Sequence, residues 1–242
     1  MFSCFVKTNI VKLKELFLYI ILNQGDTYDV FFMPGMAANS KIFEFLKFPK
    51  NFKLHYLEWF QPNENEGLKS YVDRLSKEIN GKNIILVGVS FGGIIVQELS
   101  KIMAVKKVII ISSVKSRHEL PLMMQLSKKT KAYKYLPLNW IDDFESLVVF
   151  VFGPMIKKRI SLYRKYLSFR DENYLKWAIH QIVNWEQNKP HKNTIHIHGT
   201  HDLVFPSIYI KNAIFVNGGN HAMILRKATW FNENLPKLIT QG

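Results

Sequence analysis

The sequence predicts an α/β fold, in which a mostly parallel central sheet of about six strands carries helices on both faces and an inserted all-helical cap. Three observations predict it. Short apolar runs bounded by turn residues recur along the chain, as buried strands do. Stretches with apolar residues three and four positions apart lie between these runs, and this alternation is typical of a parallel sheet. One long stretch, residues 115–190, has helical patterning and no clear strand signal.

The strands are predicted from apolar runs that have the length and β-branched content of buried strands. In chain order the runs are Tyr28–Met33, Leu54–Phe60, Ile84–Gly88, Val108–Ile111, Ile195–His198 and Ala213–Val216. Helical spacing of apolar residues is found in Gly67–Ile79, Phe91–Met103 and Ala222–Leu238. We therefore expect strand–helix units that form one sheet covered on both faces.

Residues 115–190 form the predicted cap. Helical patterning covers Leu122–Tyr135, Ile141–Phe152, Met155–Phe169 and Tyr174–Trp185. About 75 residues of helix between two strands are far more than a crossover connection requires. The prediction is a single domain whose α/β core comprises residues 1–114 and 191–242, with a helical segment at 1–25 and the cap inserted between the two parts.

The composition is that of a globular protein with a strongly basic surface. The chain has 242 residues, of which 48% are hydrophobic, so it can bury a sizeable core. Its formal net charge of +14 favours anionic partners such as nucleic acid, a membrane surface or an acidic substrate. The lysines are scattered, however, and no RNP-like, zinc-finger or helix-turn-helix pattern occurs, so a nucleic-acid partner is not predicted.

The compartment is predicted from the cysteine content and the N-terminal segment. Cys4 is the single cysteine, which suits a reducing, cytoplasmic location. The run Leu16–Leu22 follows several lysines and faintly resembles a signal peptide, but it is short and no A-x-A cleavage pattern follows. We expect an amphipathic helix packed on the domain, and no membrane insertion, because no apolar run approaches the length of a span.

The stretch Gly88-Val89-Ser90-Phe91-Gly92 matches the pattern G-x-S-x-G. Its context adds weight, because it follows a predicted strand and opens a predicted helix. A tight strand-to-helix turn lifts the serine hydroxyl above the sheet in a strained backbone, and glycines two positions before and after the serine avoid clashes. The helix N-terminus also places backbone N–H groups beside it. Ser90 is the predicted nucleophile; an incidental serine in a structural turn is the alternative.

A serine nucleophile needs a base that takes its proton, and the base needs an acid that orients it. Asp202 follows the strand predicted at 195–198, and His221 lies after the last predicted strand and just before the last helix. Parallel sheets bind ligands beyond the carboxyl ends of their strands, so we expect these residues and Ser90 at one edge. The sequence thus predicts a Ser90–His221–Asp202 triad.

Four stretches in this order resemble the α/β-hydrolase family: MPGMAANS, GVSFGG, HGTHDLVFP and GGNHAM. The resemblance runs from Tyr28 to the C-terminus and implies an oxyanion hole formed by the backbone N–H groups of Met36 and Phe91. The family also often inserts a helical cap where residues 115–190 fall. The chain departs from the family in having Pro34-Gly35 where many relatives have His-Gly, which alters the pocket wall, and in lacking an evident N-terminal antiparallel hairpin.

The substrate pocket is predicted to include Gly35, Trp140, Trp177 and Met223. Aromatic residues of the cap can line an apolar acyl pocket, although most are expected to pack the cap on the core. The basic run Lys157-Lys158-Arg159 has two interpretations. A solvated face is the default, and recognition of an anionic group such as a carboxylate or coenzyme phosphate is the alternative.

A metal site is the rival interpretation of the segment His196-Ile-His198-Gly-Thr-His201-Asp202. The segment comes close to the H-x-H-x-D-H pattern of binuclear zinc hydrolases. The match fails at Thr200, where a carboxylate is expected, and the aspartate falls after the third histidine instead of before it. His196 and His198 alternate along a strand and share one face, where structural roles suffice. Neither a metal nor a cofactor is predicted.

The predicted function is a hydrolase that cleaves a carboxylic ester or thioester of a small or acyl-chain substrate through an acyl-enzyme intermediate. Serine at the elbow argues against dehalogenases and epoxide hydrolases, which resemble this fold but use aspartate. One alternative is other cofactor-free chemistry on the same triad, such as a C–C bond hydrolase or lyase. The other is a non-turnover protein that binds a small molecule, against which a complete triad argues. Substrate identity and oligomeric state stay open.

Overall fold

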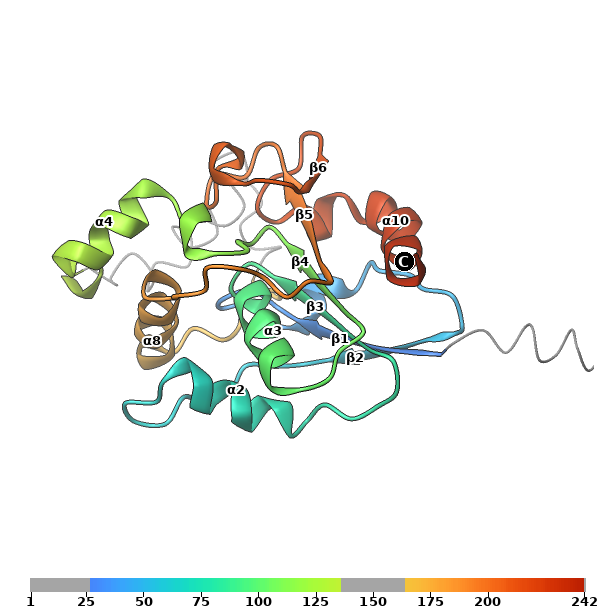
Figure 1. Ribbon diagram of the computed structural model, residues 1–242, viewed down its shortest axis with the longest axis horizontal. Helices are drawn as coiled ribbons and strands as arrows, with labels where there is room; N and C mark the ends of the chain where they lie inside the picture. The colour runs from blue at the N-terminus through green and yellow to red at the C-terminus, as the bar shows by residue number, and fades with distance from the viewer. Residues whose placement is uncertain (1–26, 136–163, 242) are drawn as a thin grey trace, which may run out of the picture.

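The computed structural model describes residues 27–135 and 164–241, and its strands form one parallel sheet (Figure 1). The strand order across the sheet is β2-β1-β3-β4-β5-β6, and each neighbouring pair is parallel. The strands are β1 (Tyr28–Met33), β2 (Phe52–Tyr56), β3 (Ile84–Val89), β4 (Lys107–Ile111), β5 (Thr194–Gly199) and β6 (Ile214–Val216). The predicted six-stranded parallel sheet is confirmed.

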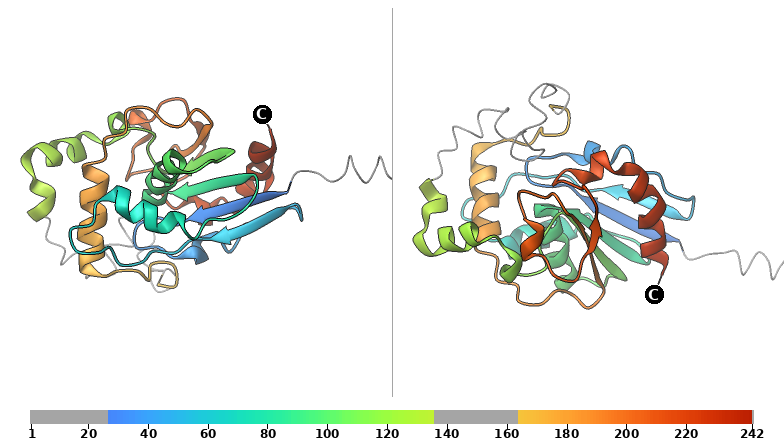
Figure 2. Two further views of the ribbon diagram at one scale, coloured as in Figure 1. Left: turned by 60° about the horizontal axis from the view of Figure 1, so that its bottom comes forward. Right: turned by 90° about the horizontal axis from the view of Figure 1, so that it is seen from above.

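Helices cover both faces of this sheet (Figure 2). The α-helices are α2 (Leu68–Ser76), α3 (Phe91–Ile102), α4 (Leu122–Thr130), α8 (Glu172–Val183), α9 (Met223–Arg226) and α10 (Ala228–Thr240). The 3₁₀ turns are η1 (Ser40–Phe43), η2 (Arg117–Glu119), η3 (Ala132–Tyr135) and η5 (Ser207–Tyr209). Helices α2 and α3 lie on one side of the sheet and α10 on the other. The buried side chains of the sheet and these helices form a single apolar core.

Burial along the strands explains their sequences. Every residue of β1 and of β4 is buried, which is why these strands are almost entirely apolar instead of alternating, with Asp29 and Lys107 as their charged residues. The edge strands differ: β2 is mixed, and β6 has two exposed residues out of three. Central strands of a sheet that has helices on both faces are apolar on both faces. They are therefore the strands that are easiest to recognise in the sequence.

Two predicted elements have different bounds in the structure. The strand predicted at Leu54–Phe60 is β2, which begins two residues earlier and ends at Tyr56. The apolar run continues because Leu57 and Trp59 are buried in the loop that follows. The last predicted helix divides into α9 and α10, since Lys227 between them has a non-helical backbone with φ −115° and ψ 30°.

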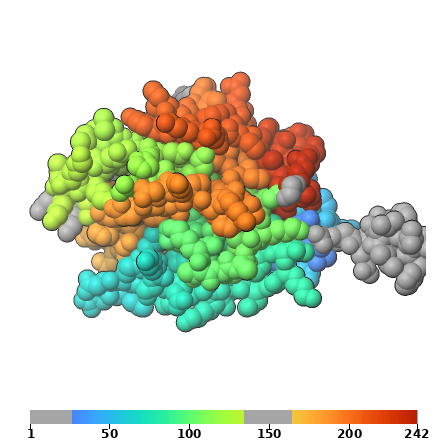
Figure 3. Space-filling view, in the orientation of Figure 1, coloured from blue at the N-terminus to red at the C-terminus, as the bar shows by residue number. Residues whose placement is uncertain are grey.

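Of the predicted cap, the structure describes residues 115–135 and 164–190. These parts contain η2, α4, η3 and α8, and no strand occurs among them. Residues 164–169, the end of the helix predicted at Met155–Phe169, are not helical. The predicted helix Ile141–Phe152 and the N-terminal segment 1–25 lie outside the described residues. Helices α4 and α8 lie beyond the carboxyl ends of the strands, and the surface of α4 is at the end of the molecule farthest from α10 (Figure 3).

None of the helices in the described ranges has both the length and the apolar character that crossing a bilayer demands.

Candidate active site

Ser90 stands at a sharp turn between β3 and α3. Its backbone has φ 53° and ψ −120°, a strained conformation for a residue with a side chain. The flanking glycines are required by close backbone approach: a Cβ on Gly88 would lie 2.2 Å from the carbonyl oxygen of Gly92, and one on Gly92 would lie 2.4 Å from that of Met33. The G-x-S-x-G pattern therefore corresponds to real steric limits on both sides of the serine.

Hydrogen bonds from the neighbouring strand hold this turn in place. The N–H of Ser90 donates to the carbonyl of Ile111 at 2.9 Å, at the end of β4. The hydroxyl of Ser113 donates to the carbonyl of Ser90 at 2.7 Å, and the N–H of Gly93 donates to the same carbonyl at 2.9 Å. The backbone N–H and carbonyl of Ser90 are both hydrogen-bonded in this way, and its side chain lies at the surface of a cavity described below.

The structure brings together the three residues predicted as a triad. Nε2 of His221 lies 2.9 Å from the Ser90 hydroxyl, and its Nδ1 lies 2.9 and 3.0 Å from the two carboxylate oxygens of Asp202. Because a carboxylate only accepts, Nδ1–H donates to Asp202 and Nε2 is free to accept the serine proton. The three residues follow β3, β5 and β6, so they meet at the carboxyl ends of the strands, as expected.

Asp202 is fixed by its own loop as well as by the histidine. One of its oxygens accepts hydrogen bonds from the backbone N–H groups of Val204 and Phe205, both at 2.9 Å. Asp202 is 2% exposed and His221 is 6% exposed. In such a dry setting each hydrogen bond is stronger than it would be in water, and the imidazole has one favourable orientation.

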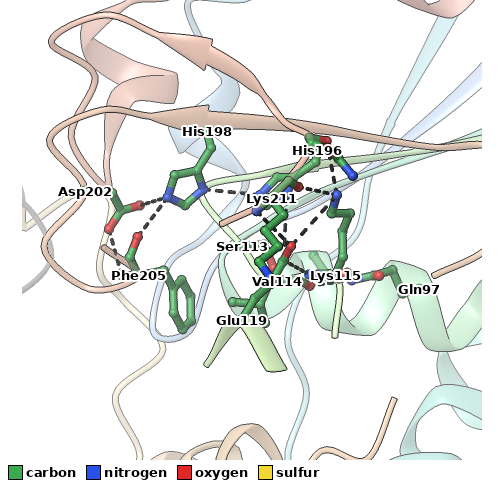
Figure 4. Close-up of polar contacts among 12 residues, drawn as sticks. Gln97, Ser113, Val114, Lys115, Glu119, His196, His198, Asp202, Phe205 and Lys211 are labelled. Atoms are coloured by element: carbon green, nitrogen blue, oxygen red, sulfur yellow. Dashed lines mark hydrogen bonds and ion pairs between the residues drawn. The ribbon is translucent and has the colours of Figure 1, made fainter. Parts of the chain in front are cut away.

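A pair of buried histidines lies behind Asp202 (Figure 4). His198 Nε2 lies 2.8 Å from the carbonyl of Phe205 and 3.8 Å from Asp202, and His198 Nδ1 lies 3.2 Å from Nε2 of His196. Burial lowers the pKa of His198, and burial with the nearby His198 and Lys115 lowers the pKa of His196 to about 2. Both rings are therefore neutral at physiological pH.

These contacts bear on the metal interpretation. His196 and His198 are hydrogen-bonded to each other, and His201 is exposed. Among residues 27–135 and 164–241 no three His, Cys, Asp or Glu side chains are grouped in a way that could hold a metal ion. The side chains of this segment thus serve Asp202 and the core of β5.

A cavity of about 390 Å³ opens in front of Ser90 and His221. Its size is typical of a small-molecule site. The core contributes Gly35, Met36, Ala38, Ile42, Val89, Val204, Phe205, Ala222, Ile224 and Leu225, and the cap segment contributes Met123, Met124, Ser127, Ala132, Tyr133, Leu167, Ile179, Ile182 and Val183. No Lys, Arg, Asp or Glu is found among these described lining residues. The nucleophile therefore faces an apolar chamber.

Met36 and Phe91, which the family resemblance assigns to an oxyanion hole, have backbone N–H groups with no hydrogen-bond partner in the described part of the chain. Phe91 is the first residue of α3, and the first N–H groups of a helix have no partner within it. Met36 lines the cavity beside Ser90. Two unused donors next to the serine hydroxyl are what an oxyanion hole requires.

No family model and no curated protein matches the sequence. A lipase-esterase related protein from Clostridium acetobutylicum has a similar structure, with a TM-score of 0.59 and 17% identity over 89% of this chain and 96% of that one. An enol-lactonase from Burkholderia xenovorans gives 0.63 and 12% over 90% and 94%, and a Bacillus megaterium epoxide hydrolase gives 0.61 and 14% over 90% and 95%.

The protein has the α/β-hydrolase fold. The resemblance inferred from the four sequence stretches is thereby confirmed at the level of the fold. The α/β-hydrolase fold hosts several chemistries, as the names of these neighbours show, so the reaction must be argued from the site itself.

The predicted pocket residues are placed differently by the structure. Gly35 lines the cavity. Trp177 does not, because its Nε1–H donates to the carbonyl of Glu66 at 2.7 Å and its ring packs against Phe91. Met223 is fully buried behind the cavity. Trp140 lies outside the described residues.

The lining residues that sequence reasoning missed are mostly apolar, and they come from the loops of the core as well as from α4 and α8. Ile179, Ile182 and Val183 lie on one face of α8, at a spacing that is typical of any helix packed on a core. A helix that packs on an empty chamber has the same pattern as one that packs on side chains. No sequence signal distinguishes the two, and Trp177, which was expected in the pocket, is not among the lining residues.

Proposed function

We propose that this protein is a serine hydrolase that cleaves uncharged carboxylic esters or thioesters with an apolar acyl group. The observation that carries the proposal is the hydrogen-bonded row from Ser90 through His221 to Asp202, which ends in an apolar cavity. The structural neighbours support the fold through their TM-scores. Because their sequence identities are low, the reaction is argued from the geometry of the site.

The proposed reaction begins when Ser90 Oγ attacks the substrate carbonyl carbon and His221 Nε2 takes the hydroxyl proton. Asp202 holds the imidazole in the required tautomer and stabilises the imidazolium that forms. The carbonyl oxygen becomes an oxyanion, which the N–H groups of Met36 and Phe91 would stabilise. His221 then protonates the departing alcohol or thiol. Water, deprotonated by the same histidine, hydrolyses the acyl-enzyme and releases the acid.

The substrate class is argued from the cavity wall. A free carboxylate or phosphate in the chamber would lose its hydration without gaining a cationic partner among the described lining residues. An aliphatic or aromatic acyl group would instead bury its surface against methionine, isoleucine and valine side chains. The partner we propose is therefore a small neutral ester or thioester. With Cys4 as its single cysteine, the chain suits a reducing compartment, and we propose the cytoplasm.

The test is the loss of hydrolysis in Ser90→Ala. Wild-type protein should hydrolyse p-nitrophenyl esters and react with a fluorophosphonate probe, and Ser90→Ala should abolish labelling and lower kcat by on the order of 10⁶-fold. Ser112→Ala is the matched control, because Ser112 is a buried serine at the end of β4 whose hydroxyl has no partner in the described residues. Hydrolysis that survives in Ser90→Ala, or tight binding of esters without turnover, would contradict the proposal.

A further inference from the structure

Trp59 is a buried residue that touches both backbone segments next to Ser90. It lies in the loop after β2 and is 5% exposed. Its indole Nε1–H donates to the carbonyl oxygen of Gly35 at 2.9 Å. Its ring stacks on the ring of Phe91, with centroids 5.1 Å apart and planes 8° apart. One side chain therefore bridges the loop after β1 and the first residue of α3.

The hydrogen bond to Gly35 fixes a neighbouring donor. The carbonyl of Gly35 and the N–H of Met36 belong to the same planar trans peptide unit, in which they point in opposite directions. An indole that holds the carbonyl from the core side turns the N–H of Met36 away from the core. Gly35 and Met36 both line the cavity, and a Cβ on Gly35 would lie 3.3 Å from Ser90 Cβ. The anchored peptide thus faces the position where an oxyanion would form.

The stacked ring fixes the other donor. Phe91 is fully buried, and Trp59 covers one face of its ring. The N–H of Phe91 belongs to the residue that follows Ser90, so the place of its side chain decides how α3 starts. Trp59 is itself held by Tyr71 and Tyr174, whose rings lie 6.3 and 5.4 Å from it.

We propose that Trp59 is a positioning residue that holds the Met36 and Phe91 N–H groups at the spacing an oxyanion requires. The inference rests on the proposed hydrolase function and goes beyond it, because that proposal names two backbone donors without saying which side chain holds them in place. The Gly35 carbonyl also accepts from the backbone N–H of Ala38 at 3.0 Å, and the indole adds the second hydrogen bond. A phenylalanine at position 59 could still stack on Phe91, but it has no N–H to make that second bond.

The test compares Trp59→Phe with Trp185→Phe. Trp185 is 4% exposed and, like Trp59, donates its indole N–H inside the protein. Its partner is the carboxylate of Glu98, whereas that of Trp59 is the carbonyl of Gly35 beside Ser90. Trp59→Phe should lower kcat for a p-nitrophenyl ester at least tenfold with KM nearly unchanged, because oxyanion donors act in the transition state, where one donor is worth about 10²–10³ in kcat. Trp185→Phe should change kcat less than about twofold on the same principle.

A second readout separates positioning from packing. A boronic acid that forms a tetrahedral adduct with Ser90 should bind Trp59→Phe more weakly by the factor lost in kcat/KM, while the product acid should bind as before. Equal losses of kcat in Trp59→Phe and Trp185→Phe, or an unchanged affinity for the boronic acid, would overturn the inference.

The inference can fail separately from the proposed function. If Ser90→Ala retains hydrolysis, the reaction proposed above is wrong, and the role of Trp59 is then decided by the amide spectrum alone. The N–H resonance of Met36 should shift and exchange faster with solvent in Trp59→Phe and stay in place in Trp185→Phe. An unmoved Met36 resonance in both variants would show that the indole does not hold this peptide.

Discussion

The sheet edge that carries Ser90, Asp202 and His221 differs sharply in packing from helix α4, which faces it across the cavity. At the edge, a single added Cβ on Gly88 or Gly92 would meet backbone atoms at 2.4 Å or less. Helix α4 has no buried residue at all, and Met123, although it lines the cavity, is 76% exposed. The turn around Ser90 therefore has no room for larger residues, whereas α4, at the far left of Figure 1, has no buried side chain.

The difference indicates a division of labour. Residues at the edge are fixed by backbone hydrogen bonds and steric limits, so a small displacement there removes the alignment that the reaction needs. Residues of α4 and α8 contribute apolar surface, and the energy of such contacts changes gradually with size. Substitutions at the edge should therefore act on kcat by orders of magnitude, and substitutions in the helices should act on substrate preference by small factors.

After the loss of the nucleophile itself in Ser90→Ala, the largest effect is expected for Asp202→Asn. Asparagine keeps an oxygen that can accept from Val204 and Phe205, so the loop should fold normally. Its amide, however, would present N–H to Nδ1 of His221 and favour the tautomer that cannot accept the Ser90 proton. We expect kcat to fall by about 10⁴-fold, as for triads of this kind. Steady-state hydrolysis of a p-nitrophenyl ester measures it.

Asp73→Asn is the matched control for this change, because Asp73 is an exposed residue of α2. Its kcat should equal that of the wild type. A loss of less than tenfold in Asp202→Asn would break the comparison, since it would mean that the best-ordered polar contacts at the sheet edge do not govern the chemistry.

The same contrast explains how much the sequence could predict. Strand β1 is predicted with its observed bounds, and β3, β4 and β5 to within one residue at either end, because strands covered on both faces are mostly apolar along their length. The convergence of Ser90, His221 and Asp202 followed from their positions after three strands of a parallel sheet. Burial of the strands and the order of residues along a parallel sheet can therefore be predicted from the sequence.

The residues that line the cavity could not be predicted in this way. Trp177 was expected to line it, but its indole is used to bind the carbonyl of Glu66. Trp59 falls within the strand predicted at Leu54–Phe60, but it lies in the loop after β2, where its indole donates to the carbonyl of Gly35. Periodicity reports that a side chain is buried and does not report what it is buried against. Which apolar residues face a cavity depends on how distant segments pack.

A smaller effect is expected on the stability of the folded protein, which should fall in acid because of the buried His196. His196 is neutral in the folded protein with a pKa lowered to about 2, whereas an unfolded histidine titrates near 6.5. Below pH 6.5 the unfolded state therefore binds a proton that the folded state does not, and stability falls as the pH falls. Between pH 7.5 and 5.5 His196 alone should remove on the order of 1 kcal/mol from the free energy of unfolding. Urea denaturation at the two pH values measures the loss.

His196→Gln should lose correspondingly less stability over this interval than the wild type. His118→Gln is the control, because His118 is exposed on η2 and its replacement should leave the pH dependence as it was. An acid-induced loss that is the same in His196→Gln as in the wild type would show that the buried histidine pair does not make the sheet edge sensitive to acid.

The smallest effect is expected across the cavity, in Ile179→Ala on α8. Ile179 is half-buried and lines the cavity, so its truncation adds room without opening the core. Esters with longer acyl chains should gain about threefold in kcat/KM relative to short ones, which is below the full value of a buried methylene because the site is partly solvated. Lys176→Ala, which removes an exposed ion pair with Glu172 on the same helix, should leave the preference unchanged. If Ile179→Ala instead lowered kcat equally for every chain length, α8 would act on the chemistry itself, and the division between a reactive edge and a selective helix pair would not hold.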